Sequence, residues 1–181
     1  MSNFIMTNSH KKFYYENIDA NSIDIMDIAH ALSNICRFGG HVDSFYSVAQ
    51  HSVIVSELVP QEYKLAALLH DASEAYLSDI VTPAKRILDD YKSLEAIITC
   101  SIDSRFGVDT SHECIKLADR KILYAEAINF FGTVKDWNID DFYCNRKIEP
   151  LGPKEAKELF LKTYHYLQIK EPYINGFEPE A

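Results

Sequence analysis

The sequence predicts an all-α fold, a bundle of helices around one core. Apolar residues recur at steps of three and four along most of the chain, which is the period of one helix face. Glycine and proline separate these segments, at Gly40, Pro60, Pro83, Gly107 and Gly132. Of the 181 residues, 47% are hydrophobic and 25% charged, which is enough for one sizeable core, so we expect a single domain over residues 1–181.

The first helix is predicted from about residue 24 to residue 36. Its apolar stripe is formed by Ile25, Ile28, Ala29, Leu32 and Ile35. The run RFGG that follows ends the helix, because glycine is a poor helix former. Residues 1–21 are polar and aromatic, and we expect a short strand or an extended arm around residues 13–15.

A pair of helices is predicted on either side of Pro60. His51 lies nine residues before Pro60, and His70 lies ten residues after it. If the two helices pack antiparallel, both imidazoles lie about 14 Å from the turn, at a rise of ~1.5 Å per residue. The spacing therefore predicts that the two rings lie side by side.

The second helix of this pair is expected to carry most of the charged groups. Its sequence, ALLHDASEAYLSDI, places His70, Asp71, Glu74 and Asp79 among apolar residues. Glu74 follows His70 by four residues and Asp71 by three, so these side chains share one helix face. Charged groups are rarely buried unless they are paired or bind a metal, and the segment therefore indicates a functional site.

The rest of the chain is also expected to be mainly helical. One helix is predicted to end at Gly107, and the next, which contains Asp119, is predicted to end at Gly132. Residues 133–150 are expected to form a loop. A last helix is predicted to open at Pro153 and to run to about residue 169.

Four side chains form a candidate metal site: His51, His70, Asp71 and Asp119. Two imidazoles and two carboxylates can hold one divalent cation and leave room for water and a phosphate oxygen. The alternative for each histidine taken singly is a hydrogen-bonded core residue, and the acidic residues after His70 favour the metal site. Mixed nitrogen and oxygen ligation suits zinc, cobalt, manganese or iron.

Composition limits the partners of the protein. The formal net charge of −9 argues against a surface that binds the nucleic-acid backbone. The four cysteines show no CxxC pairing, and neither a cleavable leader nor an apolar run long enough to span a bilayer is present. We therefore expect a cytoplasmic protein that binds neither duplex nucleic acid nor membranes.

The order His51, His70, Asp71 and Asp119, with Glu74 three residues after Asp71, resembles the HD-domain metal-dependent phosphohydrolases. The segments CRFGGH, FYSVAQHS and HDASEAYLSDIVTPAKR are similar to the 5'-deoxynucleotidase branch, which includes phage dATP triphosphohydrolases. The resemblance covers residues 24–127, with a weaker match in the last helix. It implies a single HD-type helical domain with one divalent metal between helices, assembled as a dimer or a ring of dimers.

The resemblance also implies roles for individual residues. Arg37 matches an arginine that grips phosphate, with a helix cap as the alternative. Phe38 lies where relatives place an aromatic ring against the base or sugar, with core packing as the alternative. Glu74 and Asp79 are the candidate catalytic acids. Glu74 is favoured because it shares the metal face, and Asp79 could instead be an exposed residue at a helix end.

Three further residues match substrate contacts. Lys85 and Lys116 match lysines that hold a triphosphate tail in relatives, and a solvated surface charge is the alternative for each. Pro83 matches a residue that shapes the base pocket, and a simple turn-former is the equal alternative.

Three functions are consistent with the sequence. The leading one is a dATP triphosphohydrolase that releases deoxyadenosine and triphosphate, with dADP and dAMP as further substrates, in the host cytoplasm if a phage encodes it. The second is a 5'-deoxymononucleotidase. The third is a non-catalytic metal-binding and nucleotide-binding module that regulates a partner. Two related branches are excluded, since Ala75 follows Glu74 where the ppGpp hydrolases have HDxxED, and no GYP run is present.

Overall fold

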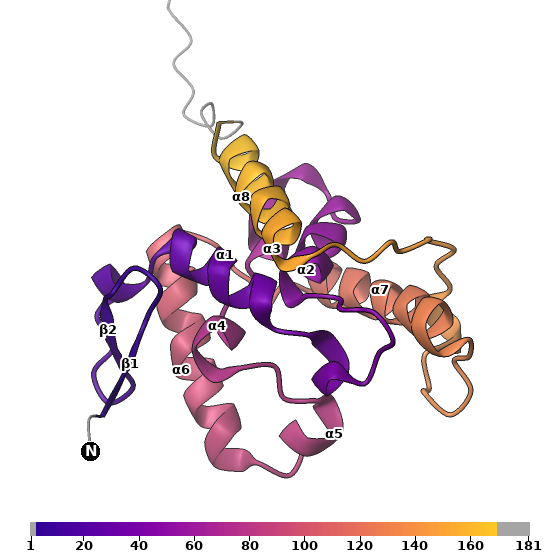
Figure 1. Ribbon diagram of the computed structural model, residues 1–181, viewed down its shortest axis with the longest axis horizontal. Coiled ribbons are helices and arrows are strands. Elements are labelled where there is room, and N and C mark those ends of the chain that lie inside the picture. Colours follow the sequence, from indigo (N-terminus) through magenta and orange to yellow (C-terminus); the bar gives the residue numbers. More distant parts are fainter. Residues whose placement is uncertain (1–2, 170–181) are drawn as a thin grey trace, which may run out of the picture.

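The polypeptide folds mainly into helices, as the sequence predicted, and Figure 1 shows them in the computed structural model, which describes residues 3–169. The one sheet among the described residues is a small antiparallel hairpin of β1 (Phe4–Met6) and β2 (Lys12–Tyr14), with Ile5 opposite Phe13. The ends of the predicted domain, residues 1–2 and 170–181, lie outside the described residues. Within residues 3–169, every helix is too short or too polar to cross a lipid bilayer.

Helices α1 (Ile25–Asn34) and α8 (Pro153–Ile169) pack against each other. Asp24 caps α1 by accepting a hydrogen bond from the Met26 amide at 2.8 Å, which satisfies a free amide of the first turn. Ile28, Ala29 and Leu32 of α1 are buried in the same core cluster as the ring of Phe160 in α8. The predicted first and last helices are therefore present, within two residues of their expected ends.

Helix α2 (Val48–Glu57) lies at the centre of the molecule and packs against α1, α3, α7 and α8. Its residues from Val48 to Ser56 are all buried, as expected for a helix that is covered on every side. The hydroxyls of Ser52 and Ser56 donate hydrogen bonds to backbone carbonyls of the same helix, so neither is left unpaired. The central position of α2 holds His51 inside the protein.

The segment after Pro60 is broken into short pieces, and the single helix predicted through residues 65–79 is wrong. A 3-10 turn η3 (Gln61–Tyr63) leads into α3 (Lys64–Leu68), a turn follows, and α4 (Glu74–Leu77) and α5 (Thr82–Lys85) come next. The ring of His70 donates from Nδ1 to the carbonyl of Ala67 at 2.8 Å. The same carbonyl accepts the His70 amide at 3.5 Å, and from there the backbone bonds span three residues in place of the four of an α-helix.

Two long helices complete the fold, α6 (Asp89–Phe106) and α7 (Glu113–Phe131). They end at Gly107 and Gly132, as predicted, and both glycines adopt the left-handed conformation that closes a helix. In Figure 1, α6 lies at the lower left and α7 extends to the right. The loop after α7 contains one 3-10 turn, η4 (Asp140–Phe142).

Two clusters of buried apolar side chains form the core, and α2 contributes to both. One lies between α1, α2, α3, α6 and α8 and includes Leu32, Val53 and Phe160. The other lies between α2, α3 and α7 and includes Val55 and Ile122. The candidate site residue His51 is held by the helix that links the two clusters.

Candidate metal centre

His51 and His70 lie side by side, as their spacing predicted. His51 comes from the buried helix α2 and His70 from the turn after α3, and their ring centroids are 5.3 Å apart. Asp119 reaches the same place from α7, with its Oδ1 3.2 Å from His51 Nε2. One ligand atom from each of these three residues lies within 4.8 Å of the other two, so the group could hold a metal ion.

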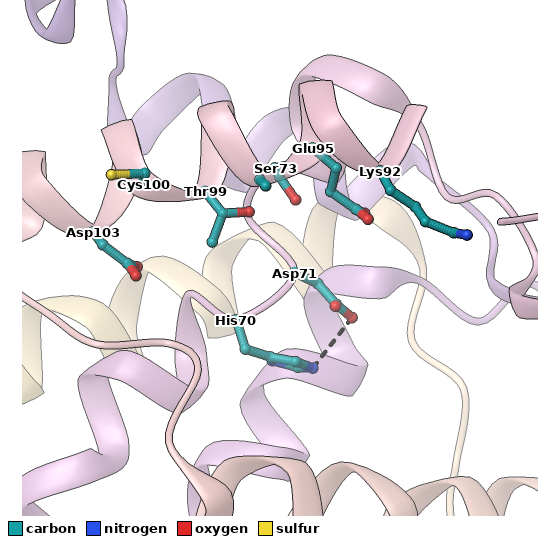
Figure 2. Close-up of a pocket in the computed structure, with 9 residues that line it drawn as sticks. His70, Asp71, Ser73, Lys92, Glu95, Thr99, Cys100 and Asp103 are labelled. Carbon is teal, nitrogen blue, oxygen red and sulfur yellow. Dashed lines mark ion pairs between the residues drawn. The ribbon is translucent and has the colours of Figure 1, made fainter. Parts of the chain in front are cut away.

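Asp71, the fourth predicted ligand, lies at the same place. Its Oδ2 is 3.3 Å from His70 Nε2 and 3.6 Å from His51 Nε2. Figure 2 shows its carboxylate turned toward the His70 ring. The structure therefore gathers all four predicted ligands from three separate parts of the chain.

The outer nitrogen of each ring is fixed as a donor. His70 Nδ1 lies 2.8 Å from the Ala67 carbonyl oxygen, which can only accept. His51 Nδ1 lies 2.7 Å from Oε1 of Glu126. When the rings are neutral, these bonds leave the lone pair of each imidazole on Nε2.

Both Nε2 atoms are buried and have no hydrogen-bond partner. Asp119 Oδ1 lies 3.2 Å from His51 Nε2, but a carboxylate oxygen and the lone pair of a neutral ring are both acceptors and cannot form a hydrogen bond with each other. Unpaired buried polar atoms are rare in native proteins because each carries a desolvation cost. A divalent cation between the rings would use both lone pairs, so the residues present fit a metal ion.

Glu126 is a site residue that the sequence analysis missed. Its side chain is fully buried on α7, where Oε1 accepts from His51 Nδ1 and Oε2 accepts from Arg37 Nη2 at 2.9 Å. It lies seven residues after Asp119, which is two helical turns, so both carboxylates share one face of α7. A single acidic residue within the run YAEAI, at this interval from a ligand, is the signal that could have found it.

Charges at the candidate metal centre shift the pKa values of Glu126 and His51. Burial alone would raise the pKa of Glu126, but the charges of Arg37 and His51 outweigh it and hold this pKa below its usual value. Burial and the Arg37 charge would lower the pKa of His51, but the carboxylates of Glu126 and Asp119 raise it to about 9. Without a metal, the carboxylates therefore favour a proton on the His51 ring, in the place that a cation would take.

Arg37 lies next to the four candidate ligands. Its Nη1 is 3.7 Å from Asp71 Oδ2, and Nη2 pairs with Glu126, while its buried Nε has no partner. The backbone fixes its position, because the Arg37 amide donates to the Tyr46 carbonyl at 2.9 Å beside a bridge between Cys36 and Ser47. The contacts of the guanidinium are with carboxylates of the candidate site. The alternative expectation for Arg37 was that it caps a helix.

Phe38 packs into an aromatic group beside Arg37. Its ring centroid lies 5.3 Å from that of Phe131, 6.1 Å from that of Trp137 and 5.3 Å from the Arg37 guanidinium carbon. The ring is only partly buried, and it packs against the core cluster that includes Val55 and Ile122.

Glu74 is the first residue of the short helix α4, and Asp79 lies two residues after its end. Glu74 is buried at its start, where Oε1 contacts Lys85 Nζ at 3.0 Å and Oε2 has no partner. Asp79 follows Ser78, whose φ of 68° is in the left-handed region that favours glycine. The strained backbone at Ser78 therefore sets the direction in which the chain presents Asp79.

The surroundings raise the pKa of both carboxyl groups. Burial raises the pKa of Glu74 well above its usual value, the charges of Asp71 and Asp79 add to this effect, and Lys85 opposes it. Burial also raises the pKa of Asp79, where Arg37 opposes the rise. A carboxyl group with a raised pKa is suited to donate a proton near neutral pH.

The three remaining predicted substrate contacts lie in different environments. Lys85 lies between Glu74 and Glu95, 2.8 Å from the latter, and its side chain is 22% exposed. Lys116 lies on an exposed face of α7 and pairs with Glu113 at 3.6 Å, as expected for a solvated charge. Pro83 is exposed near the start of α5, as a turn-former would be.

A cavity of about 430 Å³ opens beside the metal centre. His70, Asp71 and Ser73 line one side, and α6 lines the other with the following side chains: Lys92, Glu95, Ala96, Thr99, Cys100 and Asp103. Figure 2 shows this arrangement, with Glu95, Thr99 and Asp103 of α6 extending toward the side on which His70 and Asp71 lie. The volume is within the range of pockets that bind small molecules.

The fold and the site together define an all-α protein with a candidate metal centre between its helices. No model of a known protein family matches the chain. The chain is 41% identical over 175 residues to the uncharacterized protein YfdR of Escherichia coli, and the match covers 91% of this chain and 95% of YfdR. It is also 41% identical over 96 residues to an uncharacterized protein of Rhodobacter capsulatus, which covers 48% of this chain and 49% of that protein. The chain belongs to the YfdR family.

Proposed function

We propose that this protein is a metal-dependent phosphohydrolase of deoxynucleotides, with dATP as the leading substrate. One observation carries the proposal: two buried imidazole Nε2 atoms that have no hydrogen-bond partner lie beside the carboxylates of Asp71 and Asp119 and a buried arginine. The resemblance of the sequence to the 5'-deoxynucleotidase branch of the HD-domain phosphohydrolases supports the same activity.

The metal would be held by His51, His70, Asp71 and Asp119. When bound, a divalent cation there would lower the pKa of a coordinated water and polarise a phosphoryl oxygen. Zinc, cobalt and manganese all accept this mixed ligand set.

Arg37 is the candidate phosphate-binding residue. Its guanidinium has a buried Nε–H without a partner, and its Nη1 is only 3.7 Å from Asp71. The planar fork of an arginine matches the oxygens of a phosphate, and the attached positive charge balances the substrate in a protein of net charge −9. Arg37 would therefore orient the phosphate against the attacking water.

Glu74 is the candidate general acid. The 5' oxygen of a deoxynucleoside is a poor leaving group, and it needs a proton as its bond to phosphorus breaks. Glu74 keeps one carboxyl oxygen unpaired, and its raised pKa favours the protonated form. Asp79 is the alternative donor, since it lies among the same charged groups.

Cleavage of the bond between the 5' oxygen and phosphorus in dATP would release deoxyadenosine and triphosphate. Lys85 is the candidate for binding the tail, since it lies beside Glu74. To bind phosphate, its ammonium group would have to leave at least one of the two carboxylates that it contacts.

A 5'-deoxymononucleotidase is the second candidate, and the lysines favour it. Lys85 is already paired with two carboxylates, and Lys116 is exposed and paired with Glu113. Arg37 and the metal would then hold the one phosphate of a dNMP without further cations.

A product analysis separates these functions. The purified protein is incubated with manganese or cobalt and each of the four dNTPs and four dNMPs, and the products are resolved by chromatography. Deoxyadenosine and triphosphate formed from dATP in clear preference would establish the triphosphohydrolase. Cleavage of dNMPs alone would establish the mononucleotidase, and no cleavage of either class would refute the proposed function.

A further inference from the structure

Lys85 joins three elements at the edge of the candidate site. It is the last residue of α5, and its Nζ contacts Glu74 of α4 at 3.0 Å and Glu95 of α6 at 2.8 Å. Its side chain is 22% exposed, so both contacts lie in a partly desolvated place where ion pairs are stronger than on the open surface. One ammonium group therefore contacts the carboxyl groups of two side chains.

The two partners of Lys85 differ in their exposure. The side chain of Glu74 is 5% exposed, whereas that of Glu95 is 25% exposed and lines the cavity beside His70 and Asp71. In Figure 2, Glu95 projects from α6 on the side that faces Asp71. Glu95 therefore lines the cavity that a ligand would enter, whereas Glu74 does not.

We propose that Glu95 determines how long a phosphate chain the site accepts. Its carboxylate occupies Lys85 and adds a negative charge to the cavity wall, so it disfavours a triphosphate more strongly than a monophosphate. The inference rests on the proposed function, and it assigns a specificity role to a residue outside the resemblance motifs.

The physical reason is the number of charges that must share the cavity. A triphosphate brings more negative charge than a monophosphate, and like charges in a partly desolvated site repel each other. The other lysine on the cavity wall, Lys92, pairs with Asp89 at 2.8 Å, so it is not free either. When Glu95 is neutral, Lys85 keeps its charge and has one carboxylate fewer to hold it.

The matched pair of variants is Glu95→Gln and Asp90→Asn. Each removes one negative charge from α6 by an isosteric change, but Asp90 is exposed and lies outside the cavity lining that contains Glu95 and Lys92. The measurement is the ratio of kcat/KM for dATP to kcat/KM for dAMP, with manganese present. We expect Glu95→Gln to raise this ratio about tenfold, the effect of roughly 1.4 kcal/mol on the transition state, and Asp90→Asn to leave it within twofold.

A binding experiment tests the role of Glu95 without a measurement of turnover. Inorganic triphosphate, supplied as its manganese complex, is titrated into the manganese-loaded wild-type protein and both variants. We expect Glu95→Gln to bind it about tenfold more tightly than the other two. Equal affinities, or an unchanged kcat/KM ratio in an active Glu95→Gln protein, would overturn the role of Glu95. If no form hydrolyses any deoxynucleotide, the proposed function fails and the titration alone decides the role of Glu95.

Discussion

Oε1 of Glu126 accepts a hydrogen bond from Nδ1 of His51 at 2.7 Å, inside the protein. The bond fixes the orientation of the imidazole and directs its Nε2 toward His70, Asp71 and Asp119. Carboxylates that orient metal-binding histidines in this way raise the basicity of the ring and are part of the metal site. The candidate centre therefore extends from the four ligands to Glu126 and, through it, to Arg37.

Replacement of Glu126 is predicted to weaken metal binding. We expect Glu126→Gln to lower the affinity for manganese by about 10- to 100-fold, because the ring loses an anionic partner while the packing volume stays the same. Isothermal titration of the purified variant checks this. The control is Glu57→Gln, which removes an exposed carboxylate that pairs with Arg146 on the surface. Equal affinity in Glu126→Gln and wild type would show that Glu126 has no part in the site.

The stability of the metal-free protein is predicted to fall as the pH rises above neutrality. The folded pKa of His51 is about 9, above its ordinary value of 6.5, so protonation of this ring stabilises the fold below pH 6.5 and the contribution is lost as the pH rises through 9. By linkage this amounts to about 3 kcal/mol at most. Urea unfolding in the presence of a chelator, between pH 6.5 and 9, measures it.

The His51→Gln variant is the control for this pH dependence. It lacks the titrating ring, so its stability is expected to change less over the same range. The metal-loaded wild type is also expected to change less, because a bound cation requires the neutral ring. A metal-free wild type whose stability rises between pH 6.5 and 9 would contradict the assignment.

Metal binding and turnover are predicted to separate in two variants. We expect His70→Ala to lose manganese and activity together, since it removes a ligand. We expect Glu74→Gln to keep the metal and to lose about 10²- to 10⁴-fold in kcat, since an amide cannot donate the proton that leaves with the product. Metal content by mass spectrometry and the rate of nucleoside release are the two readouts. Full activity in a metal-loaded Glu74→Gln protein would refute the acid role.

The helix end at Gly107 is predicted to depend on glycine. Gly107 has a φ of 67°, and a Cβ added there would meet no atom within 4 Å, so strain in the backbone is the one cost of a side chain. We expect Gly107→Ala to lower the free energy of unfolding by about 1 kcal/mol. Gly152→Ala is the control, because its φ lies outside the left-handed region and the nearest atom would be at 3.7 Å. A loss that is equal in the two variants would argue against the backbone explanation.

Most of the helical architecture could be predicted because it follows from local patterns. The ends of α6 and α7 depend on Gly107 and Gly132, and the approach of His51 to His70 follows from their spacing around Pro60. These features need only the helix period and the conformational freedom of glycine.

The break after α3 could not be predicted in the same way. The ALLHDASEAYLSDI segment has a helical period, but from His70 the backbone bonds span three residues, and the His70 ring also donates to the Ala67 carbonyl. Which group a side chain bonds depends on its tertiary surroundings, and these cannot be seen in the sequence.

The residues that the site side chains contact could not be predicted from the sequence either. Glu126 contacts Arg37, which lies 89 residues earlier in the chain, and Lys85 contacts Glu95 only because α5 folds back against α6. Pairings of this kind depend on the packing of helices that are separate in the sequence. The sequence shows which residue types are present, but it does not show which residues they contact.

The metal content of the purified protein tests the central claim most directly. Wild type and His70→Ala are loaded with manganese or zinc, dialysed, and analysed by mass spectrometry for metal bound per chain. We predict one metal ion per chain in the wild type and a large loss in His70→Ala. A folded wild type that retains no divalent metal, or a His70→Ala variant that retains as much as the wild type, would contradict the assignment of this centre.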